Sequence, residues 1–405
     1  MLTKRSAVVV AATAPVVAEH ADAITKCFYP KLFAADPELL RVFNTAHQAT
    51  GEQPKALAAS VVAYAVHLLD PEARDLRPML DRIAHRHVSL GIRPDQYPIV
   101  GRYLLEAVAE VLGEAVTAEV AAAWDEVYWL FALELITAET RLYAQADADP
   151  GSPWMRWVVT ERIDETDDVM TLRLVPEDGS APRPVKAGQY LSVAVDLPTG
   201  GRQARQYSVS SADTDALQIT IKRIDPDGDA PAGCVSSHLH RHTRADSVLE
   251  LGPVAGDVTL LPGDGPVALI SAGIGITPIL AMLESLADEA TDRRIVVAHA
   301  DRNPATHALR AAHAKAARRL SNATLHTWYE QDRDDDALPG RMDLGDVEID
   351  PGSIAYICGP LPFMRGVRLQ LLRAGVQSER IFYEVFGPDV WAGDEDTTVA
   401  THAVS

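Results

Sequence analysis

The sequence predicts a multidomain chain with an all-α domain, an antiparallel β-barrel and an α/β domain built on a parallel sheet. Three observations carry this prediction. Apolar residues recur every three or four positions over 1–145, as in helices. They alternate with polar residues over 154–262, as in short strands. Over 263–388, apolar strands alternate with helical segments, which is typical of a parallel sheet covered on both faces.

Composition narrows the class of protein. With 47% hydrophobic and 23% charged residues, the 405-residue chain can bury several cores. A net charge of −20 argues against nucleic acid or an anionic membrane as a partner, because both favour positive patches. The cysteines Cys27, Cys234 and Cys358 fit no metal spacing and indicate a reduced, cytoplasmic setting. No apolar run reaches about 18 residues, so we expect no membrane span.

The N-terminus resembles a secretory signal, because Lys4 and Arg5 precede an apolar run over 7–18. That run contains Pro15 and continues into 19–28 with helical spacing. Proline can begin a helical turn as easily as break one. We therefore predict the first helix of the mature protein here.

The stretch 75–90 predicts a helix with one apolar face. That face consists of Leu76, Leu80 and Ile83. The next position on it is His87, whereas His85 lies about 200° further around and should face away. From this helix alone, His87 is either a hydrogen-bonded core histidine, which is the commoner case, or a metal ligand such as the axial ligand of a haem.

A second helix is expected after Gly51-Glu52-Gln53, and a helical turn at Asp36-Pro37. Gln53 shares its face with Leu57, one turn later. A polar residue there lies either at the wet rim of a core, which the helix alone favours, or inside a polar-lined pocket.

The remaining elements follow from turn residues and periodicity. Residues 146–153 form a linker by composition, and the aperiodic, acidic segment 389–405 is a predicted disordered tail. The predicted barrel strands are 157–159, 170–175, 189–195 and 217–221. The predicted strands of the α/β domain are 267–270, 294–299, 323–328 and 354–358, with helices at 276–286 and 304–319.

Two turns of the α/β domain suggest a nucleotide site. Ser271-Ala272-Gly273-Ile274-Gly275-Ile276-Thr277-Pro278 follows a buried strand and opens a helix, where backbone amides can approach a pyrophosphate. Pro278 replaces the third glycine of a dinucleotide fingerprint. Cys358-Gly359-Pro360 follows a second strand, so both turns can line one crevice at the carboxyl ends of parallel strands. The alternative is two ordinary strand-to-helix turns.

Two barrel motifs suggest a flavin. Arg205-Gln206-Tyr207-Ser208 is predicted to end a turn; arginine can pair with a phosphate, tyrosine can stack on a flat ring, and serine can bond ring heteroatoms. Gly233-Cys234-Val235-Ser236-Ser237-His238-Leu239 looks like a second helix-start anion site. Either motif alone is unremarkable.

The order of these motifs, ending with Tyr383-Glu384-Val385-Phe386-Gly387-Pro388, resembles the ferredoxin-reductase-like family of FAD and nicotinamide modules. The N-terminal part resembles a globin through residues at matching positions. These are Phe28-Tyr29, Phe43-Asn44, Gln53, Leu57, Arg86-His87, Tyr97 and Glu139. Apart from its C-terminal tail, the whole chain resembles a flavohaemoglobin.

The resemblance implies a role for each matching residue in the globin part. His87 would be the proximal ligand of haem b, with Tyr97 and Glu139 hydrogen-bonded to its far nitrogen. Tyr29 and Gln53 would lie on the distal side and donate to dioxygen. Tyr29 could instead be core, Tyr97 a helix-start aromatic, and Glu139 a solvated charge.

Three further residues would complete the haem surroundings. Phe43 would pack on the porphyrin, and Leu57 would crowd the oxygen site. Arg86, at a position that is lysine in many relatives, would contact the flavin side of the haem.

The resemblance also assigns the cofactor contacts of the reductase part. FAD would be bound by Gln189, Tyr190, Arg205, Gln206, Tyr207, Ser208 and, at its phosphates, Ser236. NADH or NADPH would be bound by Gly273, Gly275, Thr277, Pro278, Cys358, Gly359 and Pro360. Phe386, in Phe386-Gly387-Pro388, would cover the flavin face where nicotinamide docks, and Glu384 would lie near the flavin and the haem edge.

Two residues depart from the family pattern. Ile276 stands where many relatives carry glutamine, and Val385 stands where cysteine is usual. That cysteine approaches the hydride-transfer point in relatives, so its loss bears on the efficiency of hydride transfer but removes neither cofactor.

The implied activity is that of a nitric oxide dioxygenase. NAD(P)H reduces FAD, FAD reduces haem iron one electron at a time, and nitric oxide reacts with bound dioxygen to give nitrate. The alternatives are an oxygen or NO sensor or carrier with its own reductase, and a reductase of quinone, peroxide or an organic acid. Asp301 and Arg302 leave the choice between NADH and NADPH open. We expect a monomer, with a weak dimer as the alternative.

Overall fold

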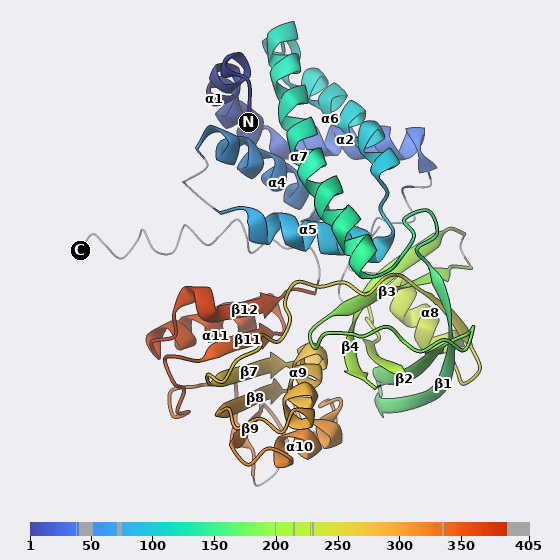
Figure 1. Cartoon of the computed structure of the whole chain (residues 1–405), viewed down its shortest axis with the longest axis vertical. Coiled ribbons are helices and arrows are strands. Elements are labelled where there is room, and N and C mark those ends of the chain that lie inside the picture. The colour runs from blue at the N-terminus through green and yellow to red at the C-terminus, as the bar shows by residue number, and fades with distance from the viewer. Residues whose placement is uncertain are drawn as a thin grey trace. The chain divides into compact units, whose positions relative to one another are not determined.

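The computed structural model (Figure 1) describes residues 1–37, 39, 52–70, 75–198, 200–213, 215–226, 228, 231–333 and 336–386, with 52–56 described by their backbone alone. The chain divides into two compact units. Within the described residues, the first unit comprises Met1–Trp154 and Asp196–Arg205, and the second comprises Met155–Val195 and Gln206–Phe386. The first break falls one residue after the predicted linker 146–153. The predicted tail, 389–405, lies outside the described residues.

Up to Gln145, the secondary structure of the first unit is helical throughout its described residues, as predicted. Its helices are α1 (Lys4–Glu19), α2 (Ala21–Ala35), α4 (Glu52–Leu69), α5 (Arg77–Leu90), α6 (Tyr97–Leu112) and α7 (Ala118–Gln145), with 3₁₀ turns η2 (Pro94–Gln96) and η3 (Gly113–Ala115). Threonine side chains cap two of them, because Thr3 accepts from the Ser6 N–H and Thr117 accepts from the Val120 N–H.

The N-terminal run forms a helix, as predicted. Pro15 lies inside α1, and Val10, Ala14 and Val17 of this helix are buried in the core of the unit. No described helix is by itself long and apolar enough to cross a membrane. Only α1 and α2 taken together pass that test, and they are bent by 81°.

The close approach of α6 and α7 depends on a glycine. A Cβ atom at Gly101 would collide with the ring of Tyr128. The Tyr128 hydroxyl donates to the Tyr97 carbonyl at 2.6 Å, so the same contact ties the start of α6 to α7.

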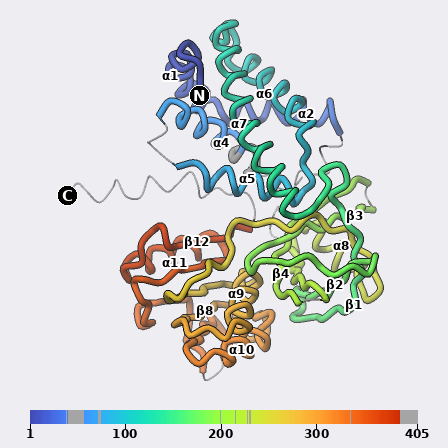
Figure 2. The backbone as a smooth tube through the Cα atoms, in the orientation of Figure 1, coloured from blue at the N-terminus to red at the C-terminus, as the bar shows by residue number. Residues whose placement is uncertain are grey.

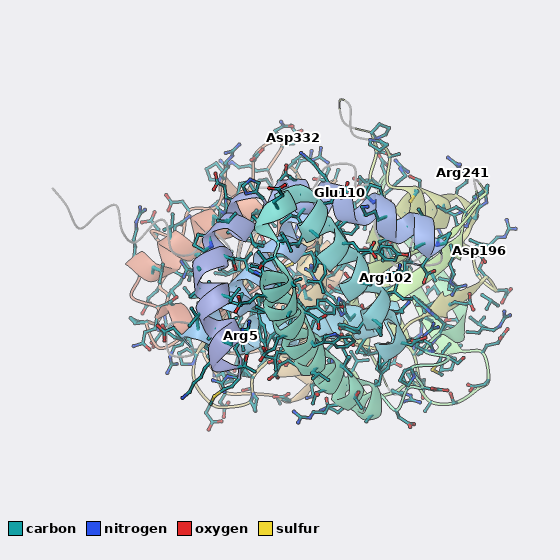
Figure 3. The ribbon with its side chains drawn as sticks, turned by 90° about the horizontal axis from the view of Figure 1, so that it is seen from above. Arg5, Arg102, Glu110, Asp196, Arg241 and Asp332 are labelled. Carbon is teal, nitrogen blue, oxygen red and sulfur yellow. The ribbon has the colours of Figure 1, made fainter. Side chains whose placement is uncertain are left out.

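Charged side chains lie on the outside of these helices (Figure 3). Arg5 of α1 pairs with Glu119 at 2.6 Å, and Glu110 of α6 pairs with Lys31 at 2.7 Å. Exposed pairs of this kind contribute little, roughly 0–1 kcal/mol each, so packing rather than charge holds the unit together.

The predicted antiparallel barrel is confirmed. Its strands are β1 (Met155–Thr166), β2 (Val169–Pro176), β3 (Tyr190–Asp196), β4 (Arg202–Ala212), β5 (Leu217–Lys222) and β6 (Val248–Leu251). They close in the order β1-β2-β5-β4-β3-β6, and the helix α8 (Cys234–His242) lies between β5 and β6 in the chain.

Two barrel strands, β4 and β6, were not predicted from the sequence. Arg205-Gln206-Tyr207-Ser208 was predicted to end a turn, but it lies in the middle of β4. This strand lacks regular alternation, because its buried and partly exposed residues come in runs and its pairing with β5 shifts between Val209 and Ser211. β6 has only 4 residues, which is too short to show a period.

The parallel sheet is also confirmed, with strand order β10-β9-β8-β7-β11-β12. The strands are β7 (Val267–Ala272), β8 (Ile295–Asp301), β9 (Ala323–Tyr329), β10 (Leu338–Pro339), β11 (Ile354–Cys358) and β12 (Ile381–Glu384). Its helices are α9 (Ile276–Asp288), α10 (Arg310–Arg318) and α11 (Leu361–Arg373), with 3₁₀ turns η4 (Gly273–Gly275) and η5 (Ser378–Arg380). α9 and α10 pack side by side (Figure 2), with Leu283 and Ala316 in one core.

The helix predicted near 304–319 begins later, at Arg310. The residues before it form a turn in which the Asn303 side chain accepts from the N–H groups of Ala305 and Thr306, at 3.0 and 3.1 Å. Side-chain bonds of this kind compete with helix formation, which explains the late start.

Candidate active site

His87 lies in the last turn of α5, which is followed by the C-cap residue Gly91 with φ +76°. Within α5, Ala84 and Val88 are fully buried, whereas Leu80, Ile83 and His87 are half-buried. His85 is half-buried too, so burial does not separate the two histidines as the helix pattern predicted. The evidence for His87 comes from its hydrogen bonds instead.

His87 is hydrogen-bonded to both residues that the family resemblance pairs with it. Its Nδ1 lies 2.7 Å from Glu139 Oε1 and 3.1 Å from the Tyr97 hydroxyl. The Tyr97 hydroxyl donates to the same Glu139 oxygen at 2.5 Å. A carboxylate next to Nδ1 assigns the proton to that nitrogen, which leaves the lone pair on Nε2 for a metal.

Local structure positions this triad firmly. Tyr97 begins α6 directly after η2, where the Arg93 N–H donates to the Gln96 side chain at 2.8 Å. Glu139 lies on α7 between two tyrosines whose hydroxyls bond backbone carbonyls, Tyr128 to that of Tyr97 and Tyr143 to that of Ile92 at 2.8 Å. α7 therefore holds the segment between α5 and α6 on both sides of Glu139.

The triad of His87, Glu139 and Tyr97 contains a buried carboxylate, which is unusual for a packed core. The Glu139 side chain is only 1% exposed, and its Oε2 has no hydrogen-bond partner in the described residues. Burial, followed by the Glu139 charge, raises the pKa of Tyr97 well above its usual range. Tyr97 is therefore a neutral donor, and the carboxylate acts chiefly on the His87 imidazole. This donor set fits a haem, whose iron His87 would hold through Nε2, and the carboxylate would orient the imidazole and increase its electron density.

The structure describes only some of the other residues predicted around the haem. Tyr29 lies on α2, is 5% exposed, and packs against the rings of Phe28 at 4.8 Å and Phe33 at 5.7 Å. Leu57 of α4 and Arg86 of α5 are half-buried. Phe43 and the Gln53 side chain lie outside the described residues, so their roles stay predictions.

The predicted flavin residues Arg205 to Ser208 lie along β4. Ser208 is buried, and its Oγ has no hydrogen-bond partner in the described part of the chain. An orphaned buried hydroxyl is costly, so it fits a bound ring with polar heteroatoms. The Arg205 guanidinium donates to Gln203 at 3.2 Å and to the Ala204 carbonyl at 2.7 Å, and Gln206 and Tyr207 are half-buried.

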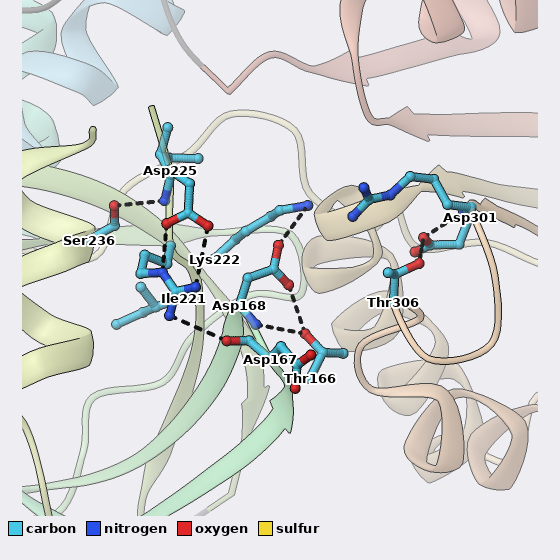
Figure 4. Close-up of polar contacts among 12 residues, drawn as sticks. Thr166, Asp167, Asp168, Ile221, Lys222, Asp225, Ser236, Asp301 and Thr306 are labelled. Carbon is cyan, nitrogen blue, oxygen red and sulfur yellow. Dashed lines mark hydrogen bonds and ion pairs between the residues drawn. The ribbon is translucent and has the colours of Figure 1, made fainter. Parts of the chain in front are cut away.

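Two other predicted flavin residues of the second unit, Ser236 and Gln189, form hydrogen bonds with the protein backbone. The Ser236 hydroxyl accepts from the Ile224 N–H at 3.2 Å (Figure 4) and donates to the Gly233 carbonyl at 3.3 Å. Because this hydroxyl is engaged by the chain, a phosphate at the predicted site would be bound by the backbone N–H groups at the start of α8. Gln189 accepts from the Lys186 N–H at 2.9 Å, and its neighbour Tyr190 is buried.

The two turns predicted to line one crevice do lie together. Ser271 of β7 is the register partner of Cys358 of β11, so both strands end at the same edge. A Cβ atom at Gly275 would collide with the Cys358 carbonyl. Gly273 has φ +52°, a left-handed conformation that favours glycine. Thr277 and Pro278 are buried at the start of α9, and Pro360 caps α11.

Glu384 reaches this edge as well, because it is the register partner of Cys358 on β12. Burial, followed by the Glu384 charge, raises the pKa of the Cys358 thiol well above its usual range, so it stays protonated. Phe386 is 47% exposed, whereas Gly387 and Pro388 lie outside the described residues.

The Asp301 carboxylate is hydrogen-bonded by the chain itself. Asp301 ends β8, its side chain is 6% exposed, and its carboxylate accepts from Thr306 Oγ1 at 2.5 Å and from the Arg302 N–H at 2.7 Å (Figure 4). Burial alone would raise the pKa of Asp301, but its hydrogen bonds lower it. The carboxylate is therefore engaged by the chain, and Arg302 is the exposed member of the pair.

Three buried histidines next to this edge were not predicted from the sequence. The His299 and His307 rings stack at 4.0 Å, and His313 stands edge-on to both. His299 bonds Ser271 Oγ at 2.8 Å, and His307 bonds the Tyr329 hydroxyl at 2.7 Å. Their spacing in the sequence carries no recognisable signal, because strand, loop and helix each contribute one.

Together, the fold and these sites define a class of protein in which a haem-type globin is joined to a reductase that binds flavin and nicotinamide. Comparison with known proteins agrees. A globin family model matches residues 26–135, and an oxidoreductase NAD-binding domain model matches 269–369. Flavohemoprotein of Chromobacterium violaceum is 42% identical, covering 96% of this chain and 98% of the relative. Flavohemoprotein of Rhizobium meliloti is 41% identical, covering 97% and 100%. The chain belongs to the flavohaemoprotein family.

Solved structures show the same architecture. The flavohemoglobin of Malassezia yamatoensis with bound FAD and heme superposes with a TM-score of 0.87 at 34% identity, covering 95% of this chain and all 100% of that one. The FAD/NAD-binding domain of the nitric oxide dioxygenase of Vibrio cholerae is 34% identical, with a TM-score of 0.55 over 58% of this chain and 99% of that one.

Proposed function

We propose that this protein is a nitric oxide dioxygenase that uses haem b, FAD and NAD(P)H, with dioxygen and nitric oxide as substrates. The observation that carries the proposal is the His87–Glu139–Tyr97 triad. The relatives support it, because the similar flavohemoglobin structure contains FAD and heme and the similar reductase domain belongs to a nitric oxide dioxygenase. When bound, haem and FAD supply one-electron iron chemistry and the conversion of a hydride into single electrons.

The triad makes the imidazole of His87 electron-rich. Glu139 places a buried negative charge at Nδ1, and Tyr97 holds the carboxylate oxygen in place with a neutral hydroxyl. With His87 holding the haem iron, a strongly donating imidazole would favour activation of dioxygen over its reversible storage. A globin used as a sensor or carrier does not need this arrangement.

Other residues bind and orient the substrates and coenzymes. Tyr29 and Gln53 would donate hydrogen bonds to dioxygen, with Leu57 limiting the space beside it. On the reductase side, Ser208 would bond the flavin ring and Arg205 a phosphate. The Gly273–Gly275 turn and the Cys358-Gly359-Pro360 turn would hold the nicotinamide coenzyme at the edge they share. The cytoplasmic location and the monomeric state stay predictions.

Spectroscopy tests the cofactor assignment. Purified protein should show both a Soret band and flavin absorption. His87→Ala should lose the Soret band, whereas the matched variant His85→Ala, two residues away on the same helix, should keep it. If the two variants lose it equally, His87 is not the specific ligand.

Activity tests the reaction. In air, protein loaded with both cofactors should consume nitric oxide in an NAD(P)H-dependent reaction that forms nitrate. Each nitrate requires one electron and each hydride carries two, so two nitrate ions should form per NAD(P)H oxidised. Wild type that consumes nitric oxide no faster than Tyr29→Phe would contradict the proposed mechanism.

A further inference from the structure

Two glutamates of the second unit join the barrel to the α/β domain through hydrogen bonds. The Ser211 hydroxyl of β4 donates to Glu284 Oε2 of α9 at 2.6 Å, which sets α9 beside β4 (Figure 1). The Leu309 N–H, directly before α10, donates to Glu165 Oε2 of β1 at 3.2 Å. Both glutamates are half-buried. Neither is among the residues predicted to bind haem, flavin or the coenzyme, so the cofactor sites do not explain these bonds.

The Ser211–Glu284 bond connects the strand of the flavin site to the helix of the coenzyme site. Ser211 follows Ser208, the buried hydroxyl that would bond the flavin ring, on the same strand. Glu284 lies on the helix that begins directly after the Gly273–Gly275 turn, which would hold the coenzyme. One hydrogen bond therefore ties together two elements that we expect to carry flavin and nicotinamide.

The Glu165 bond connects the same strand to the loop after β8 through buried hydroxyls. Ser210 Oγ lies 3.0 Å from Thr220 Oγ1, which lies 2.9 Å from Thr171 Oγ1. The Thr171 hydroxyl donates to Glu165 Oε1 at 2.9 Å, and Glu165 Oε2 accepts from the Leu309 N–H. Each of these three hydroxyls is at most 3% exposed. Buried polar groups are costly unless they are hydrogen-bonded, so this chain is held as a unit.

The backbone of Leu309 gives the Glu165 bond a further effect. Leu309 has φ +56°, a left-handed conformation that is unfavourable for a bulky side chain. Its N–H lies at the start of α10, where the helix dipole favours a carboxylate. The loop that ends at Leu309 begins with Asp301 and Arg302, which follow the strand where the coenzyme ribose could bind. Glu165 therefore fixes this loop from the side of the barrel.

We propose that Glu284 and Glu165 are positioning residues for hydride transfer, because they hold the α/β domain and its coenzyme in a fixed place against the flavin strand. The inference rests on the proposed function for the location of the two cofactors. The hydride takes two electrons from the nicotinamide ring, which is oxidised, to the flavin ring, which is reduced. The reacting atoms must lie about 3–3.5 Å apart, and a misplacement of about 1 Å can slow a reaction about 100-fold.

The two glutamates differ in how many oxygens they use. In the described part of the chain, Glu284 accepts through Oε2 alone, so the amide oxygen of a glutamine can replace it. Glu165 uses both oxygens, for Thr171 and for Leu309, and a glutamine has only one acceptor oxygen. Glu284→Gln should therefore transfer hydride like wild type, whereas Glu165→Gln should be slower than wild type and faster than Glu165→Ala.

Anaerobic stopped-flow measurement of flavin reduction tests the Ser211–Glu284 bond. Full-length protein with haem and FAD bound is mixed with NADH or NADPH, and the loss of flavin absorption gives the limiting rate and the half-saturating coenzyme concentration. Ser211→Ala and Glu284→Ala should each lower the limiting rate roughly ten-fold and change the half-saturating concentration less than about two-fold, because the coenzyme turns remain intact. The double variant should be no slower than either single variant, because one shared bond is lost in all three.

Ser285→Ala is the matched control. It removes another serine–glutamate bond of α9, from Ser285 Oγ to Glu289 Oε1 at 3.3 Å, which does not reach the barrel, and it should leave flavin reduction unchanged. A second measurement needs no turnover, because oxidised coenzyme stacked on reduced flavin gives a long-wavelength charge-transfer absorption. This absorption should weaken in Ser211→Ala and Glu284→Ala and persist in Ser285→Ala and Glu284→Gln.

Three results would overturn the inference. The first is unchanged flavin reduction and charge-transfer absorption in Ser211→Ala and Glu284→Ala. The second is independent losses that multiply in the double variant, and the third is an equal loss in Ser285→Ala. Flavin content and thermal unfolding show whether each variant folds, and Ser211→Ala, which removes one hydroxyl from a half-buried site, serves if Glu284→Ala does not.

Neither measurement uses nitric oxide or dioxygen. A protein that shows these effects but forms no nitrate would contradict the proposed dioxygenase activity and leave the positioning role intact. A protein that forms nitrate with unchanged flavin reduction in the variants would do the reverse.

Discussion

We predict that mild acid lowers the free energy of unfolding of the α/β domain, because this domain contains buried histidines. His307 is 5% exposed and His313 is 1% exposed, and both Nε2 atoms lack a hydrogen-bond partner in the described residues. Burial lowers the pKa of His313 to about 3. Burial, followed by the nearby His299, lowers the pKa of His307. Both imidazoles are therefore neutral in the folded protein at pH 7.

The sign follows from proton binding. The unfolded chain has ordinary histidines with pKa values of about 6.5, so below that pH it binds protons that the folded domain does not. Stability is therefore fully present above about pH 6.5 and is lost as pH falls below it. Each histidine contributes about 1.4 kcal/mol per pH unit. Between pH 7.5 and 5.5, the two together lower the free energy of unfolding by roughly 3 kcal/mol.

Regional hydrogen–deuterium exchange can measure this loss, once corrected for the pH dependence of intrinsic exchange. Peptides covering β8 and α10 should lose protection as pH falls from 7.5 to 5.5, while those of α7 serve as an internal reference. In His313→Phe, which keeps an aromatic ring but cannot titrate, about half of the loss should disappear. An unchanged loss in that variant would refute the reasoning.

Three further predictions concern single residues. Glu139→Gln should keep the haem but lower nitric oxide turnover roughly ten-fold, as measured by nitrate formation, because the imidazole loses its charged partner. Equal turnover would show that the charge is unimportant. Gly101→Ala should lower the free energy of unfolding by about 1–3 kcal/mol through its collision with Tyr128, whereas Gly366→Ala, which meets open space on α11, should not; thermal unfolding distinguishes them. Gly275→Ala should raise the KM for NAD(P)H at least about ten-fold, because a Cβ atom would force apart the two turns that we propose hold the coenzyme; an unchanged KM would show that these turns do not bind the coenzyme.

The sequence by itself determined the features that depend on residues close together in the chain, namely the secondary structure and the class of each domain. Periods of 3.6 and 2 residues predicted the three classes of domain, because side chains on one face of a helix or strand share one environment. The step from Leu76 to Leu80 and Ile83 also pointed to His87. Strands without a regular period, such as β4, stayed hidden, because a shift in pairing breaks the alternation.

Only the tertiary structure decided which distant groups meet. His87 and Glu139 are separated by 52 positions, and it is the packing of α5 against α7 that brings them to 2.7 Å. The structure likewise gathered three histidines into one buried cluster and turned Asp301 inward. Hydrogen bonds and burial act through space, so no local period records them, and the chemistry of this protein depends on both.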